Sequence, residues 1–193
     1  MDKKYGKLIN IAMWSAIVLF VIRCIVSWNS IIEGITLYEL FGYTGETISV
    51  AVIFTAFYEQ KLWRYNPWET TPKLHAKYVG TFTSNYDSIV REGTLDIKQT
   101  LSTVSVIFTT KESKSRPLSA SIDEIMGEMQ LTYCYINQPK SEFRHRSEIH
   151  FGTAMLTISE DGSLKGQHFT DRKTRGDMEF WADEKSLMSI ERK

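Results

Sequence analysis

The sequence predicts a membrane-anchored all-β protein, with an N-terminal hairpin of two transmembrane helices followed by an eight-stranded up-and-down β-barrel. Three observations predict it. Two long apolar segments fill the first third of the 193-residue chain. Segments of alternating apolar and polar residues fill the rest, and short turn sequences separate most of them. No long amphipathic helix interrupts this second part.

The first apolar segment, Leu8 to Trp28, reads LINIAMWSAIVLFVIRCIVSW and contains a single charge, Arg23. At about 1.5 Å per residue, a helix of this length crosses a hydrocarbon core about 30 Å thick. A cleaved signal peptide is the alternative, but no small-x-small cleavage site follows the apolar run. The residues before Cys24 are also too large for a lipoprotein site. We therefore expect a membrane span.

The second span is expected as a helix from about Tyr43 to Trp63, because Gly42 and Gly45 indicate a turn before it. A partly re-entrant segment is the alternative. Basic residues precede the first span and follow the second, whereas the connection Asn29–Tyr43 has none. The positive-inside rule then places both ends of the hairpin in the cytoplasm. The expected domains are residues 1–66 with spans at about 8–28 and 43–63, a linker at 67–72, and a cytoplasmic barrel at 73–193.

Arg23 and Glu46 stand at similar distances from the loop between the two spans. Charges inside a membrane are costly and usually partnered, so the two side chains can pair at similar depth. In the alternative, Arg23 extends to the outer interface and leaves Glu46 unpaired.

After the linker the hydrophobic period changes to two. Eight short strands at regular spacing predict a barrel or a sandwich, and the short turns favour an up-and-down barrel. A barrel of this size has room inside for side chains or for one small ligand. The expected strands are Leu74–Thr83, Ser88–Thr100, Leu101–Lys111, Pro117–Ile125, Glu128–Asn137, Ser147–Glu160, Leu164–Asp171 and Gly176–Ala182, with one helical turn as an alternative at Ile122–Met129.

Composition and motifs exclude several classes of function. The 23 Lys and Arg balance the 23 Asp and Glu, so no strong field attracts DNA or RNA. Two cysteines in unlike segments predict neither a disulfide framework nor a thiolate metal site. No HExxH, GxSxG or phosphate-binding loop is present, and the histidines are scattered. We therefore expect no catalytic residues, no metal site and no enzymatic activity.

The remaining chemistry is cationic and lies in the last predicted hairpin, FTDRKTRGDMEF. Arg172 and Arg175 offer planar guanidinium groups for phosphate, and Thr174 offers a hydroxyl. Tyr78, in the first strand, offers an aromatic face for stacking on a base. A second cationic run, FRHRSEIH, precedes the sixth strand. The alternative is an ordinary charged turn at the barrel rim.

The chain resembles the two-transmembrane, β-strand-rich effectors associated with SMODS nucleotidyltransferases, which act in the CBASS antiphage system. The resemblance rests on the architecture of essentially the whole chain, on the opening strand PKLHAKYVGTF and on the final hairpin RKTRGDMEF. It implies a lipocalin-like barrel that binds a cyclic dinucleotide made by a partner nucleotidyltransferase (CD-NTase). This nucleotide is the activating ligand, and no other cofactor is implied. The resemblance extends ligand contact to Tyr78, Arg172, Thr174 and Arg175.

The resemblance also implies a location and a mechanism. The protein is expected in the bacterial inner membrane as a multi-pass protein, with both termini and the barrel in the cytoplasm. Nucleotide binding drives homo-oligomerisation, and the helices then disrupt the lipid bilayer and kill the infected cell. Two alternatives come from the barrel alone: a membrane-tethered lipocalin-like carrier of a lipid or other small ligand, and an assembly module with a packed barrel.

Overall fold

A computed structural model describes residues 3–145 and 147–183. Within them the chain divides after Glu69 into a helical unit and a barrel unit, and Thr100–Ser102 group with the helical unit. The division falls inside the segment 67–72 that we expected to be a linker. Residues 184–193, which the sequence assigned to the barrel domain, lie outside the described residues.

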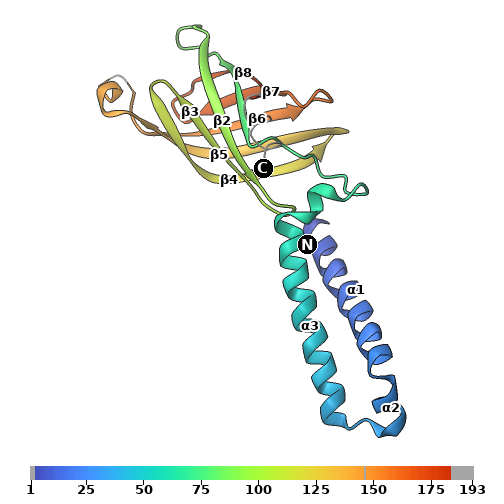
Figure 1. Ribbon diagram of the computed structural model, residues 1–193. Helices are drawn as coiled ribbons and strands as arrows, with labels where there is room; N and C mark the ends of the chain where they lie inside the picture. Colours follow the sequence, from blue (N-terminus) through green and yellow to red (C-terminus); the bar gives the residue numbers. More distant parts are fainter. Residues whose placement is uncertain (1–2, 146, 184–193) are drawn as a thin grey trace. The chain divides into compact units, whose positions relative to one another are not determined.

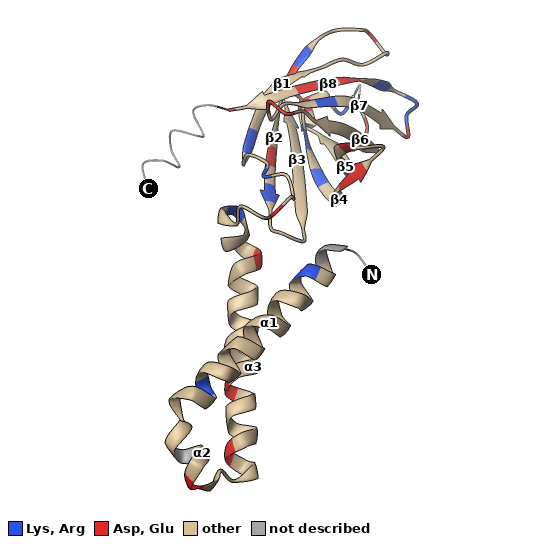
Figure 2. Cartoon of the chain, turned by 90° about the vertical axis from the view of Figure 1, so that its right-hand side faces the viewer, with Lys and Arg blue, Asp and Glu red and all other residues tan. Residues whose placement is uncertain are grey.

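The helical unit consists of α1 (Lys3–Val26), α2 (Trp28–Gly34) and α3 (Leu37–Gln60), followed by a short 3₁₀ turn at Leu62–Tyr65. Helices α1 and α3 lie side by side, and α2 lies in the connection between them (Figure 1). The segments Tyr5–Val26 and Leu37–Gln60 are each long and apolar enough to cross a membrane. Few charged residues interrupt either helix (Figure 2).

Helix α3 begins at Leu37, earlier than the expected start at Tyr43. A capping box explains the early start. The backbone N–H of Glu39 donates to Oγ1 of Thr36 at 3.2 Å, and the backbone N–H of Thr36 donates to the Glu39 carboxylate at 2.9 Å. This reciprocal pair satisfies two N–H groups that a helix end leaves open. The two glycines that suggested a turn here are instead accommodated inside the helix.

Arg23 and Glu46 form an ion pair between α1 and α3, with Nε of Arg23 at 3.0 Å from Oε2 of Glu46. The Arg23 guanidinium also lies over the ring of Tyr43, 4.2 Å from its centroid, and donates to Oγ of Ser27. Of the two arrangements that the sequence left open, the structure has the ion pair. Arg23 is thus held by a carboxylate, an aromatic face and a hydroxyl within the helical unit.

The barrel unit is a closed antiparallel barrel in which each strand pairs with the next and β8 pairs back with β1. This confirms the predicted eight-stranded up-and-down barrel. Closure leaves no free sheet edge. The strands are β1 (Lys77–Phe82), β2 (Arg91–Gln99), β3 (Val104–Thr110), β4 (Ser113–Ile125), β5 (Glu128–Pro139), β6 (His150–Ile158), β7 (Leu164–Thr170) and β8 (Arg175–Ala182).

Strands β4 and β5 form the longest hairpin, joined by Met126 and Gly127. Both residues have positive φ angles, 54° and 85°, as in the type I′ turns that suit the twist of two-residue hairpins. The helical turn considered for Ile122–Met129 is therefore wrong. A β-bulge lies between Pro117 and Ser119 in β4, where the register against β5 shifts.

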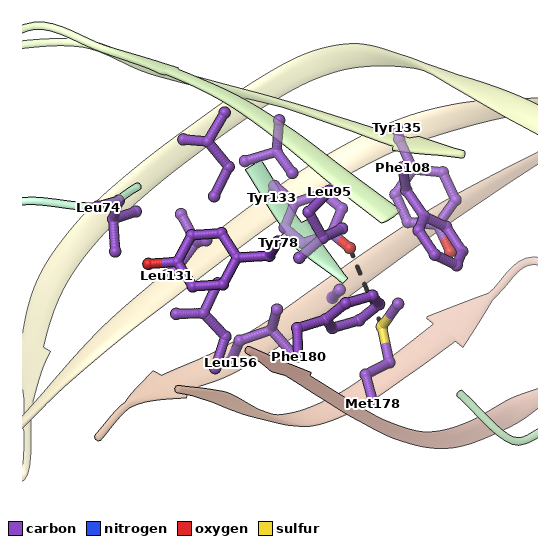
Figure 3. Close-up of a cluster of buried hydrophobic side chains, with 14 of the residues drawn as sticks. Leu74, Tyr78, Leu95, Phe108, Leu131, Tyr133, Tyr135, Leu156, Met178 and Phe180 are labelled. Carbon is purple, nitrogen blue, oxygen red and sulfur yellow. Dashed lines mark hydrogen bonds between the residues drawn. The ribbon is translucent and has the colours of Figure 1, made fainter. Parts of the chain in front are cut away.

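Alternate residues of the strands point inward and form the hydrophobic core. On β5, Leu131, Tyr133 and Tyr135 are buried, whereas the residues between them are only partly buried. In Figure 3, Leu74 lies at one end of the core, and Phe108 and Tyr135 lie at the other. Leu74 precedes β1, so the core fills the barrel end that the chain enters and stops at the two aromatic rings.

Candidate ligand-binding site

The opposite end of the barrel is hollow. In an up-and-down barrel, the ends of odd-numbered strands and the starts of even-numbered strands meet at the same end. Here that end holds a cavity of about 540 Å³. Its wall includes Phe82 at the end of β1, Arg91 at the start of β2, Thr110 at the end of β3 and His150 at the start of β6. The barrel therefore has one packed end and one open end.

Aromatic rings separate this cavity from the core. Phe82 and Phe108 lie edge to face, with ring centroids 5.1 Å apart and planes at 86°. Tyr135 is almost fully buried and lies against Gly152 of β6, where an added Cβ atom would sit 2.5 Å from the phenol oxygen. A side chain at position 152 would therefore displace the ring. Burial raises the pKa of Tyr135 to about 12, so its hydroxyl stays protonated near neutral pH.

Polar side chains form the next layer of the wall. Asn137 continues the inward face of β5 beyond Tyr135 and is 9% exposed. Thr174 lines the cavity from the loop between β7 and β8, and its hydroxyl lies 2.6 Å from that of Thr170. Lys173, within the same loop, has a φ of 60°. This tight turn directs Thr174 back toward the end of β7.

Two arginines stand at the cavity. Nη1 of Arg91 donates to Oδ1 of Asp87 at 2.9 Å, and its second amino group also contacts this carboxylate. The hydrogen bonds from Arg91 lower the pKa of Asp87 to about 2. Arg172 extends from the loop after β7, and its Nη1 donates to Oγ of Ser147 at 3.1 Å. Arg172 thus has a neutral partner, whereas Arg91 is already paired with an anion.

His168 lies deeper in the wall, on the inward face of β7, and is 6% exposed. Its Nδ1 is buried without a hydrogen-bond partner among the described residues. Burial lowers the pKa of His168, and the nearby His150 lowers it further, although the charge of Asp177 and the backbone of Gly176 act in the opposite direction. The imidazole is therefore neutral at pH 7.

This lowered pKa predicts a pH dependence of stability. The unfolded imidazole binds a proton more readily than the folded one, so stability is fully present above the unfolded pKa near 6.5. It is lost progressively as the pH falls below that value. When the pH is lowered from about 7.5 to 5, the free energy of unfolding should fall less in His168→Gln than in the wild type. Denaturant unfolding of the full chain in detergent, followed by tryptophan fluorescence, measures the difference. His145→Gln, at an exposed position, is the control, and equal pH slopes in both variants would contradict the prediction.

The structure brings together two of the four residues that the sequence assigned to ligand contact. Arg172 and Thr174 both line the cavity. Arg175 lines a separate, smaller hollow with Asn85 and Asp177, and its backbone N–H donates to Oδ1 of Asn85 at 3.0 Å. The described residues that line the main cavity do not include Arg175.

The fourth residue, Tyr78, lies in the packed core and is 1% exposed. The described residues that line the cavity do not include it either. Of the second cationic run, Arg144 is exposed after a short 3₁₀ turn at Ser141–Phe143, and Arg146 lies outside the described residues. Sequence reasoning missed Arg91, Asn137 and His168. They could have been found only from the topology, because each lies near the strand ends that meet at the open end of the barrel.

A closed barrel with one packed end and one hollow, arginine-bearing end belongs to the class of barrels that have room for one small ligand. Residues 69–181 match the family described as Cap15, cyclic dinucleotide receptor domain, and the chain belongs to this family. It is also 29% identical over 182 residues to CD-NTase-associated protein 15 of Staphylococcus schleiferi, covering 92% of this chain and 97% of that protein. The resemblance to CBASS effectors drawn from the sequence is confirmed.

Proposed function

We propose that the barrel cavity binds a cyclic dinucleotide made by a partner CD-NTase, and that binding activates the chain as a membrane-disrupting effector. The observation that carries this proposal is the hollow end of the barrel, which falls within the matched residues 69–181. Its volume of about 540 Å³ lies in the range of small-molecule sites. No cofactor besides this activating ligand is proposed.

The cavity offers suitable chemistry for such a ligand. The guanidinium of Arg172 can donate two parallel hydrogen bonds to a phosphate, and the hydroxyl of Thr174 can donate another. The aromatic rings at the cavity floor present flat faces for a base. The proposal does not include the contacts through Tyr78 and Arg175 that the resemblance implies. The buried position of Tyr78 and the separate hollow beside Arg175 favour Arg172 and Thr174 as the main contacts.

The second part of the proposal concerns the membrane. The two apolar helices insert into the inner membrane, with both termini and the barrel in the cytoplasm. The positive-inside rule favours this orientation, because Lys3 and Lys4 precede the first span and Lys61 follows the second. Two helices per protomer cannot line a wide pore, so disruption needs many copies. Nucleotide binding favours the conformation in which a protomer can oligomerise. Because every protomer of a large oligomer binds nucleotide, small free energies per protomer add up to a strong preference for assembly.

Reconstitution of the full chain into dye-filled lipid vesicles tests both parts. Cyclic dinucleotides should raise the thermal unfolding temperature and release the dye, and a variant lacking residues 1–59 should release none. Stabilisation without dye release would overturn the membrane mechanism. Stabilisation by added fatty acids, but by no cyclic dinucleotide, would identify the protein as a lipid carrier instead. The charged cavity wall and the family both favour the nucleotide.

A further inference from the structure

Asn137 is a buried amide whose side chain makes no hydrogen bond with another described residue. It lies on the inward face of β5, is 9% exposed, and lines the cavity. Polar groups in folded proteins are nearly always hydrogen-bonded, either to the protein or to what fills the space beside them. An unpartnered amide at the wall of a cavity is therefore placed to bind what enters the cavity.

The surroundings of Asn137 restrict what can bind it. Across the sheet it is in register with His150, whose Nδ1 is occupied by the backbone carbonyl of Glu148 at 2.9 Å. Toward the core, the next inward side chain on β5 is Tyr135. The amide thus borders an aromatic surface on one side and the cavity mouth on the other. No charged side chain among the described residues is hydrogen-bonded to it, so a neutral, flat group suits it better than a phosphate.

A second unpartnered polar atom supports the same interpretation. Nδ1 of His168 is buried without a partner among the described residues, and its ring forms part of the same wall. Its lowered pKa favours the neutral ring, in which one nitrogen donates and the other accepts a hydrogen bond. The cation Arg172 lies instead in the loop after β7, at the mouth. Asn137 and His168 thus offer neutral polar groups beside the aromatic rings, and the charge of Arg172 lies at the entrance.

We propose that one nucleobase of the cyclic dinucleotide enters the barrel first, that Asn137 reads its hydrogen-bonding edge with His168 beside it, and that the phosphates stay at the mouth with Arg172. The inference rests on the proposed function and adds the residue that selects the base. The Asn137 amide presents one acceptor and one donor side by side, the pattern that pairs with adjacent groups on a base edge. Tyr135 and Phe108 then supply the faces against which this base packs.

Titration calorimetry on the full chain in detergent micelles tests the inference with cyclic di-AMP, cyclic di-GMP, cyclic di-UMP and cyclic GMP–AMP. The wild type should prefer one of them. Asn137→Leu removes the donor and the acceptor. It should lower the affinity for the preferred nucleotide about 5- to 150-fold and reduce the differences in affinity among the four nucleotides. Asn137→Asp replaces the donor by an acceptor and should reorder the ranking. Gln138→Leu, on the outer face of β5, is the matched control and should change neither.

Each remaining result would overturn the inference. Suppose that the wild type binds nucleotides, and that both Asn137 variants keep the same order of affinities or lose affinity for all four nucleotides equally. Asn137 then does not select the base. If the wild type binds none of them, the proposed function itself fails, and the inference with it. Should both variants misfold, an analogue lacking one hydrogen-bonding group on the edge of the preferred base replaces them. Unchanged affinity of the wild type for this analogue would also contradict base reading.

Discussion

Arg172→Ala should weaken cyclic dinucleotide binding roughly 10- to 100-fold, the effect expected from losing a charge-assisted contact worth about 1.5–3 kcal/mol. The guanidinium lines the cavity and is held by a neutral hydroxyl, that of Ser147, at 3.1 Å. Because this partner carries no charge, the positive charge of Arg172 is available to bind a phosphate. Arg172→Lys retains the charge but loses the planar pair of donors, so its loss of affinity should be intermediate.

Arg175→Ala is the matched control, because this arginine is three residues away but lines a different hollow. Titration calorimetry should find its affinity within about threefold of the wild type, since no contact with the ligand in the main cavity is removed. Both variants should unfold at the same temperature as the wild type without nucleotide. The reverse pattern, a large loss only for Arg175→Ala, would move the ligand to the hollow formed by Asn85 and Asp177.

The fold could be predicted from the sequence because local patterns determine it. The length of the apolar runs indicates spans, and the period of two indicates strands whose short turns leave little choice of topology. The start of α3 was missed for a local reason as well. Gly42 and Gly45 suggested a turn, although Thr36 and Glu39 have the spacing of a capping box and outweigh two glycines inside a helix.

The site could be predicted only where its residues are neighbours in the sequence. Arg172 and Thr174 stand in one charged hairpin, so composition was enough to find them. Asn137 and His168 look like ordinary strand residues until the register of the closed barrel brings them to the same end. Tyr78 shows the complementary case: its inward orientation follows from alternation, but its position along β1 puts it in the packed end.

Arg23→Leu should destabilise the helical hairpin in a bilayer by at most about 2.5–3.5 kcal/mol, the cost of an unpaired charge at the centre of a membrane helix. The substitution leaves the Glu46 carboxylate without its partner at 3.0 Å. Replacing both residues with leucine removes both charges and should cost less than Arg23→Leu alone. Glu46→Gln keeps an acceptor for Arg23 and leaves its contact with the ring of Tyr43, so its effect should be intermediate.

Unfolding of the full chain in bicelles by titrated SDS measures these differences as a double-mutant cycle. Glu33→Gln in α2 removes an acidic charge outside the two spans and should have little effect. The order of the variants decides between pairing and extension of Arg23 to the outer interface. With pairing, the double variant is more stable than Arg23→Leu, because no charge is left alone in hydrocarbon. If Arg23 and Glu46 were each solvated at the interface, the two substitutions would simply add, and the coupling energy of the cycle would be zero.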